Sequence, residues 1–167
     1  TSSTVVGYFS GAIGITNAFS SLNTILTSTF YPFVNKTKNS IKKINILILI
    51  FGLFTTILMF ISASFTVDNI LGNTMINSIP LVMILSLSPL LLSIRTVYGI
   101  NYLLANKMDN LYMRIALFSS IFGLIIGLIL IPIFGATAAA LVIITSQLLY
   151  AFLSYIFHMK KMRLYGI

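Results

Sequence analysis

The sequence predicts an all-α polytopic membrane protein with about five transmembrane helices, and three observations support that prediction. Only 7% of the 167 residues are charged and 58% are hydrophobic, whereas soluble domains carry about 25% charged residues. Apolar stretches of about 20 residues recur along the chain, which is the length a helix needs to cross a bilayer. The basic residues lie between these stretches and do not form one soluble face.

The predicted spans follow one another with short connections. The expected helices cover residues 5–34, 44–67, 76–104, 111–134 and 136–158. Continuous apolar runs such as 46–51 lack the period-two alternation of barrel strands. Helices are therefore expected, because they satisfy their own backbone hydrogen bonds in lipid. The chain starts at Thr1 with a span beginning almost at once, so we expect a single transmembrane region cut from a longer protein with further spans before it.

The segments between the spans alternate in charge. The connections at 68–74 and 132–135 contain no Lys or Arg, whereas the first and third connections and the tail are basic. The Lys/Arg excess marks cytoplasmic segments, so the N-terminus is expected outside and the C-terminus in the cytoplasm. The same pattern explains the net charge of +8 without nucleic acid as a partner. The basic residues of these segments are Lys36, Lys38, Lys42, Lys43, Lys107, Lys160, Lys161 and Arg163, with Arg114 just inside the fourth helix, and Arg95 is the one that lies elsewhere.

Small polar residues follow the first predicted helix at steps of three or four. Such a face cannot turn to lipid, because unsatisfied polar groups there are costly. Interhelical packing and the wall of a hydrated cavity both explain it, and the width of two adjacent stripes favours the cavity. One stripe contains Ser10, Gly14, Asn17, Ser21, Thr24, Ser28 and Tyr31, and its neighbour contains Thr16, Ser20, Asn23 and Thr27.

Two further polar residues lie inside predicted spans. Arg95 precedes Lys107 by 12 residues, which is about 18 Å along a helix, and this places it in the membrane toward the cytoplasmic half. Intramembrane arginines usually face a cavity or a partner, although snorkelling to the interface is an equal alternative. Gln147 is a weaker candidate that buried hydrogen bonding also explains. Pro80 and Pro89 are expected to bend the third helix, either as a static kink or beside a transport site.

The residue inventory excludes several classes of activity. The chain has no Cys and one His, and its only acids are Asp68 and Asp109. Neither a metal site nor an acid–base pair can be assembled from these residues, and no Gly-rich phosphate loop is present. We therefore expect no enzyme activity, no metal and no cofactor. The spans also lack the acid that a pump for organic cations usually needs.

Short motifs occur in a fixed order along essentially the whole chain. The motifs are Gly-Tyr-Phe-Ser-Gly-Ala (7–12), Asn17, Phe-Tyr-Pro (30–32), Leu-Gly (71–72), Ser-Pro-Leu (88–90), Tyr-Gly-Ile-Asn-Tyr-Leu (98–103) and Ile-Pro-Ile-Phe-Gly-Ala (131–136). In this order they resemble the polysaccharide flippases, the Wzx-like O-antigen and capsule repeat-unit transporters of the multidrug/oligosaccharidyl-lipid/polysaccharide exporter superfamily. Ala138 departs from the family pattern, which often has a second glycine there, and this change is expected to affect packing.

The resemblance implies a transporter of about twelve helices in two lobes, with this chain forming most of the second lobe. It implies translocation of undecaprenyl-pyrophosphate-linked oligosaccharide across the bacterial cytoplasmic membrane by alternating access. The implied partners are this substrate, the lipid bilayer, the missing N-terminal lobe and polysaccharide polymerase machinery. The substrate-binding candidates are Arg95, Asn17, Ser21, Thr24, Ser28, Asn23 and Gln147.

Two other functions stay open. A multidrug or toxin extruder of the same superfamily is the nearest, and the lack of intramembrane acids argues against it. A non-transporting subunit of a polysaccharide assembly complex is the second, and the broad polar face of the first helix disfavours it. A membrane glycosyltransferase or polymerase fits less well, because loops rich in acids or arginines are missing.

Overall fold

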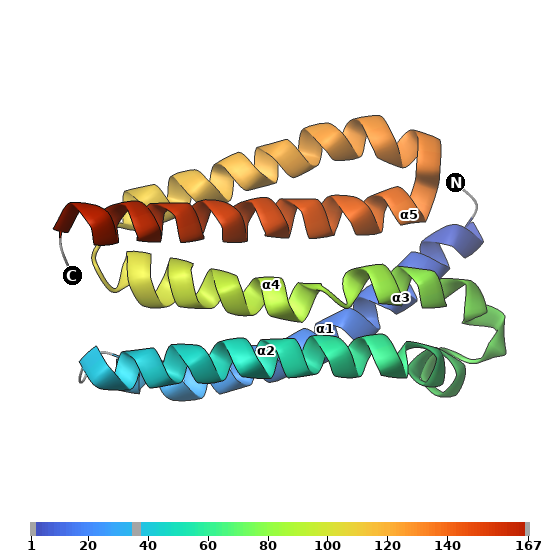
Figure 1. Cartoon of the computed structure of the whole chain (residues 1–167). Helices are drawn as coiled ribbons and strands as arrows, with labels where there is room; N and C mark the ends of the chain where they lie inside the picture. The colour runs from blue at the N-terminus through green and yellow to red at the C-terminus, as the bar shows by residue number, and fades with distance from the viewer. Residues whose placement is uncertain (1–2, 35–37, 166–167) are drawn as a thin grey trace.

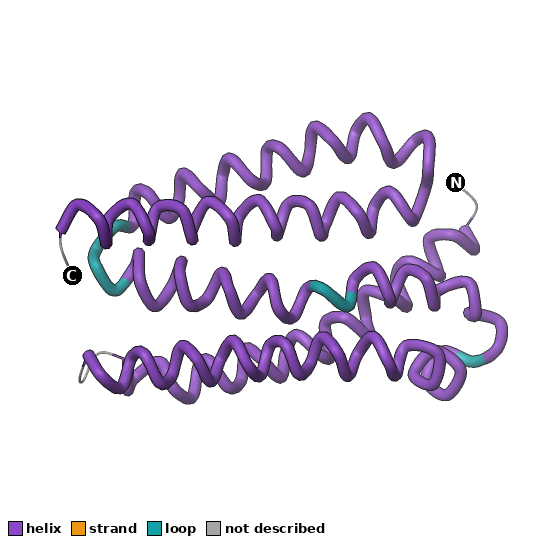
Figure 2. The backbone as a smooth tube through the Cα atoms, in the orientation of Figure 1, coloured by secondary structure: helices purple, strands orange, loops and turns teal. Residues whose placement is uncertain are grey.

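A computed structural model describes residues 3–34 and 38–165, and this part of the chain contains helices and short turns without a strand (Figure 2). The fold class expected from the sequence is therefore confirmed. The helices in chain order are α1 (Ser3–Val34), α2 (Lys38–Thr66), η1 (Val67–Leu71), η2 (Asn73–Ser78), α3 (Ile79–Leu85), α4 (Ser88–Arg95), η3 (Thr96–Leu104) and α5 (Asp109–Tyr165).

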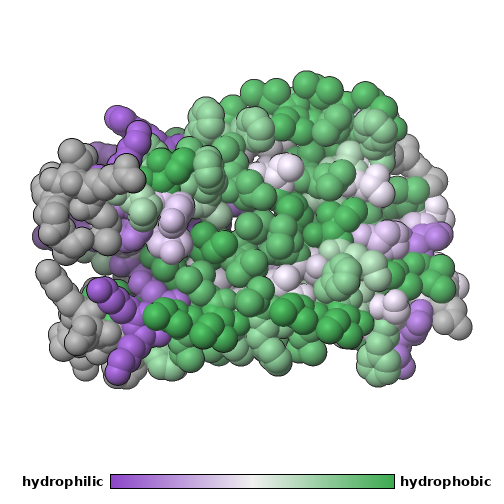
Figure 3. Space-filling view, in the orientation of Figure 1, coloured by the Kyte–Doolittle hydropathy of each residue, from purple (hydrophilic) through white to green (hydrophobic). Residues whose placement is uncertain are grey.

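The helices are apolar enough for a membrane. Among the described residues, three helices have the length and composition to span one: Ile41–Leu71, Thr74–Leu104 and Asp109–Lys160. Large apolar side chains cover the outer surface (Figure 3), with Ile61 76% and Leu128 70% exposed. A surface of this kind is stable in lipid and not in water. α1 is not among the three, in keeping with its polar faces.

α5 folds back on itself at Gly135. Gly135 has φ 62° and ψ −134°, a conformation that side chains with a Cβ rarely adopt. The apolar stretch Asp109–Lys160 contains 52 residues and would be about 78 Å long as one straight helix. The bend instead sets two limbs side by side (Figure 1), and it falls between the fourth and fifth helices expected from the sequence. With α1, the count of five spans stays a prediction.

The third predicted helix is a broken helix. It consists of η2, α3, α4 and η3, with a turn at residues 86–87 between α3 and α4. Pro80 and Pro89 each lie in the first turn of the helix that follows a break. Proline has no N–H for the preceding turn and is tolerated at this position. The expected bend therefore takes the form of a helix interruption at Pro89.

Apart from Arg95, the described basic residues gather at one end of the bundle. That end holds the start of α2, the turn between η3 and α5, and the free ends of both α5 limbs (Figure 1). Hydrophilic side chains cluster there in Figure 3. Asp68, on η1, lies at the opposite end. Lys36 lies outside the described residues, and the side of the membrane that each end faces stays a prediction. The described residues at the basic end include Lys42, Lys43, Lys107, Arg114 and Lys160.

Candidate functional site

The first polar stripe of α1 lies on the surface of the bundle. Its positions share one side of the helix, and every described member is exposed. The hydroxyls of Ser21 and Ser28 donate to the carbonyl oxygens three residues earlier, at 2.7 and 2.9 Å, and Thr24 donates to Ser20 at 3.2 Å. The hydroxyl oxygens can still accept hydrogen bonds from the outside. The stripe contains Ser10, Gly14, Asn17, Ser21, Thr24 and Ser28, and the side chain of Tyr31 lies outside the described residues.

The second polar stripe of α1 faces inward. Thr16 is 6% exposed and Asn23 is 5% exposed. The Asn23 amide Nδ2 donates to Thr55 Oγ1 of α2 at 3.2 Å and to the Pro89 carbonyl oxygen at 3.3 Å. The structure therefore separates Asn23 from the other α1 candidates: it packs between helices and does not line an open surface. Two residues along a helix correspond to a rotation of about 200°, which is why Ser21 and Asn23 face opposite ways.

The helix break at Pro89 is held by polar groups from two other helices. The Leu90 backbone N–H donates to Thr56 Oγ1 of α2 at 3.1 Å. The Pro89 carbonyl oxygen accepts from Ser93 Oγ at 2.9 Å as well as from Asn23. Backbone groups freed by a break must find partners inside a membrane protein. Sequence reasoning missed Thr55 and Thr56, although a Thr pair in an otherwise apolar span was a usable signal. We call Asn23, Thr55, Thr56, Pro89 and Ser93 the break junction.

Arg95 lies at the end of α4 beside a small cavity of about 130 Å³. Arg95 and Gln147, both expected from the sequence, line the cavity together. Arg95 Nε and Gln147 Oε1 are buried without a hydrogen-bond partner in the described structure. The cavity wall therefore contains one donor and one acceptor that no described group satisfies. Its lining comes from α4 and both limbs of α5: Leu91, Leu92, Arg95, Ser119, Ser120, Ser146, Gln147 and Tyr150.

Aromatic residues of α5 surround the Arg95 guanidinium. Its Cζ lies 4.6 Å from the centre of the Tyr150 ring, a cation–π contact. Its Nη2 donates to the Tyr112 hydroxyl at 3.4 Å. Both tyrosines were missed from the sequence, because neither lies near Arg95 along the chain. Neither partner is an acidic side chain, so neither contact brings a negative charge that would offset that of the half-buried guanidinium.

The two candidate regions form separate surfaces of this chain. None of the described side chains of α1 lines the Arg95 cavity. It reaches α2 and Pro89 through Asn23, on the side turned away from Ser21. The structure therefore brings Arg95 together with Gln147 and leaves Asn17, Ser21, Thr24 and Ser28 on the exposed side of α1. No cluster of three or more potential metal-ligating His, Cys, Asp or Glu occurs in the part of the chain that the structure describes.

The amino-acid sequence of this chain is similar to that of a known bacterial protein. The chain is 30% identical over 155 residues to a protein of Escherichia coli (strain K12) named "Putative O-antigen transporter". The match covers 87% of this chain and 37% of that protein, so the chain spans just over a third of its length. No family profile matches the chain. No solved structure matches it either.

Proposed function

We propose that this chain is part of a membrane transporter that moves a lipid-linked oligosaccharide with an anionic pyrophosphate head group across the cytoplasmic membrane. The observation that carries the proposal is a half-buried cation, Arg95, whose described partners are two tyrosines, in a bundle whose α1 presents an exposed polar stripe. The similarity to a protein named as an O-antigen transporter supports it.

The chemistry of the two regions suits the two parts of that head group. A guanidinium binds phosphate oxygens through two parallel N–H donors, and Arg95 Nε is buried and unpartnered beside Gln147. Sugar hydroxyls need many donors and acceptors, which Asn17, Ser21 and Ser28 can supply from α1. The lipid chain can stay in the bilayer while only the head group crosses.

The exposed stripe of α1 needs a cover that the described residues do not supply. The hydroxyl oxygens on this face can still accept hydrogen bonds, which lipid cannot donate, so we infer that it faces a hydrated space shared with the remaining part of a longer protein. Alternating access then consists of rocking between the two parts. The α3–α4 break gives this chain an interrupted helix, a feature found near the binding sites of transporters.

A drug extruder of the same superfamily is the second candidate. Such pumps use an intramembrane acid as the counter-charge. Asp68 and Asp109, the acids in the described chain, lie near the ends of the bundle (Figure 1). A non-transporting subunit is disfavoured, because lipid offers no hydrogen bonds to an exposed polar stripe on a helix within the membrane.

The test is deletion of the gene in its native host, followed by complementation with the full-length protein. A flippase deletion should abolish surface polysaccharide and leave lipid-linked repeat units on the cytoplasmic leaflet, with drug susceptibility unchanged. Increased drug susceptibility with normal polysaccharide would favour the extruder. Normal results in both assays would contradict a transporter of either kind.

A further inference from the structure

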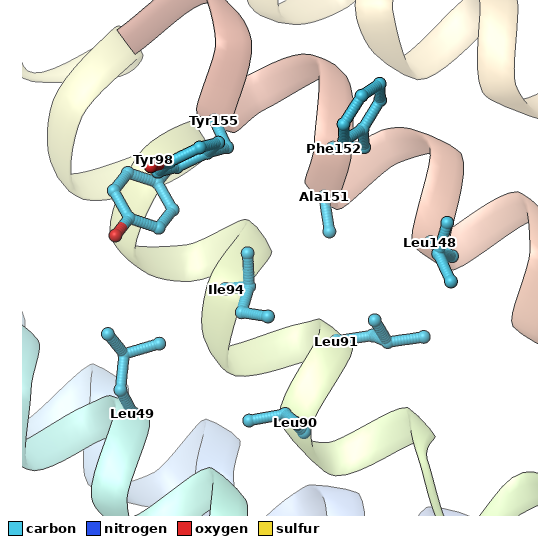
Figure 4. A pocket seen from close by; sticks show the side chains of 9 residues that line it. All are labelled: Leu49, Leu90, Leu91, Ile94, Tyr98, Leu148, Ala151, Phe152 and Tyr155. Carbon is cyan, nitrogen blue, oxygen red and sulfur yellow. The ribbon is translucent and has the colours of Figure 1, made fainter. Parts of the chain in front are cut away.

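A groove on the outer side of the bundle has a wall that is apolar except for two tyrosine hydroxyls. Its volume is about 430 Å³, and it lies between α2, α4, η3 and the second limb of α5. Leu49 lies on α2, Ile94 on α4, and Leu148 and Phe152 on α5, and Figure 4 shows the lining side chains of these three helices around one space. Leu148 is 49% and Phe152 is 56% exposed, so the groove is open from the side. We call it the α2–α5 groove.

The groove is closed at one end by two tyrosines. The rings of Tyr98 and Tyr155 meet edge to face with their centres 5.2 Å apart (Figure 4). Tyrosines of membrane proteins gather at the depth of the lipid head groups. Tyr155 precedes Lys160 by five residues, about 7.5 Å along a helix. The tyrosine end of the groove is therefore the basic end of the bundle.

A lysine lies on the groove side of α2 beyond this end. Lys42 precedes Leu49 by seven residues, which returns it to the same face of the helix about 10.5 Å nearer the basic end. Lys42 is exposed. The order along this face is then hydrocarbon wall, tyrosine hydroxyls and ammonium group. An amphiphile with an apolar chain and a negative head group has the complementary order.

We propose that the α2–α5 groove binds an acyl chain of an anionic phospholipid, with the phosphate at the tyrosine end and directed toward Lys42. An ordinary bilayer lipid is the occupant, and not the chain of the proposed transport substrate. α1, which carries the exposed polar stripe, contributes no residue to the groove and runs behind α2 in Figure 1. A head group on that stripe and a chain in this groove would lie on different sides of the bundle. The proposal therefore does not rest on the proposed function.

The test uses the full-length protein in vesicles that contain a trace of photoreactive lipid, with a diazirine in the middle of its acyl chain. The head group is phosphatidylglycerol in one arm and phosphatidylcholine in the other. After irradiation, mass spectrometry locates the labelled residues. We expect phosphatidylglycerol to label residues 90–98 and 148–155 more strongly than phosphatidylcholine does.

Two variants separate the chain contact from the head-group contact. Leu148→Trp fills the groove and should lower labelling about fivefold for both lipids. Its control is Leu128→Trp, an exposed position on the other limb of α5. Lys42→Gln should lower only the phosphatidylglycerol labelling, also about fivefold, the factor corresponding to roughly 1 kcal/mol for one basic residue at an anionic surface. Its control is Lys107→Gln, another exposed lysine at the basic end.

Two results would overturn the proposal. In the first, both lipids label the groove equally, and Lys42→Gln does not change the labelling. The groove would then be an unselective lipid contact. Absence of label from the groove, with label elsewhere on the protein, would mean that another protein segment covers it. Leu148→Trp and Lys42→Gln change exposed side chains, so thermal unfolding of the purified variants should match that of the parent protein and exclude misfolding as the cause.

Discussion

The side-chain amide of Asn23 donates a hydrogen bond to the carbonyl oxygen of Pro89, 66 residues further along the chain, at 3.3 Å. This contact ties α1 to the point where the third predicted helix is interrupted. The same amide donates to Thr55 Oγ1 at 3.2 Å, so α1, α2 and α4 meet at the break junction. Because the contact is buried, it contributes to the stability of the bundle and not to an open binding surface.

Asn23→Ala should therefore lower stability. The change leaves Thr55 and Pro89 each with one partner fewer, and interhelical hydrogen bonds in membrane proteins contribute about 0.6 to 1.7 kcal/mol. We expect a loss of about 1 kcal/mol in the free energy of unfolding of the full-length protein in detergent. Asn17→Ala, at an exposed position on α1, is the matched control and should leave unfolding unchanged. Equal effects of the two changes would contradict the assignment of Asn23 to packing.

Gly52→Ala should destabilise the same junction by a different route. A Cβ at Gly52 would overlap the Ser93 side chain and approach the Pro89 carbonyl oxygen. Overpacking of this kind costs about 1–3 kcal/mol. Gly14→Ala is the control, since a Cβ there meets nothing within 4 Å. Adding Ser93→Gly to Gly52→Ala removes the overlapping atoms, so the double variant should regain part of the lost stability in thermal unfolding. A double variant no more stable than Gly52→Ala would exclude the overlap as the cause.

Most of the fold could be predicted from the sequence, because long apolar runs and their breakers act locally. Gly135 separates the two limbs of α5 where the pattern placed a boundary, and Pro89 interrupts the helix in which it lies. The sequence did not show whether Pro89 would bend the helix or interrupt it, nor which groups would satisfy the freed backbone. The interruption depends on Thr56 of α2 binding the Leu90 N–H, and a contact between separate spans leaves no trace in local periodicity.

The candidate site was predictable only in part. Both stripes of α1 consist of small polar residues, so the sequence could not tell that Asn23 faces inward while Ser21 faces out. Arg95 was recognisable, because a cation inside an apolar span is rare. Its aromatic partner was not, since Tyr150 lies 55 residues away in sequence and the chain contains eight tyrosines.

Cysteine accessibility along α1 should repeat with the helix period. Single cysteines at 10, 14, 17, 21, 24 and 28 in the full-length protein should react with a polar thiol reagent, because these positions are exposed and are expected to face water. Cysteines at 12, 15, 16 and 23 should resist, since these positions are buried. Reactivity at every third or fourth position is the expected pattern. Uniform protection would mean that the remaining part of the protein packs tightly against the stripe.

The two ends of the bundle should differ in access from outside the cell. Cysteine in place of Asn69, an exposed residue on η1, should be labelled by an impermeant thiol reagent in intact cells. Cysteine in place of Lys107, exposed in the turn before α5, should be labelled only after the membrane is opened. The reason is that the basic end is expected in the cytoplasm. The reverse pattern would invert the predicted topology.

Arg95 carries the sharpest prediction for transport. If its guanidinium holds the pyrophosphate, Arg95→Lys should keep part of the activity, because the charge remains while the paired donors are lost. Arg95→Ala should abolish most of it at an unchanged protein level. Tyr150→Phe keeps the aromatic ring that faces the cation and should leave activity near that of the parent. Tyr112→Phe removes the 3.4 Å hydrogen bond and should reduce it moderately.

The measurement is surface polysaccharide in the deletion strain complemented with each full-length variant, together with the amount of variant in the membrane. Tyr150→Leu is a control for Tyr150→Phe. It removes the aromatic ring and with it the cation–π contact to Arg95, whereas Tyr150→Phe keeps both. If the Arg95 charge binds the substrate directly, Arg95→Ala should lower surface polysaccharide more than any of the other changes. Normal polysaccharide from Arg95→Ala would reduce Arg95 to an interfacial anchor, with its guanidinium held by Tyr150 and Tyr112 for packing alone.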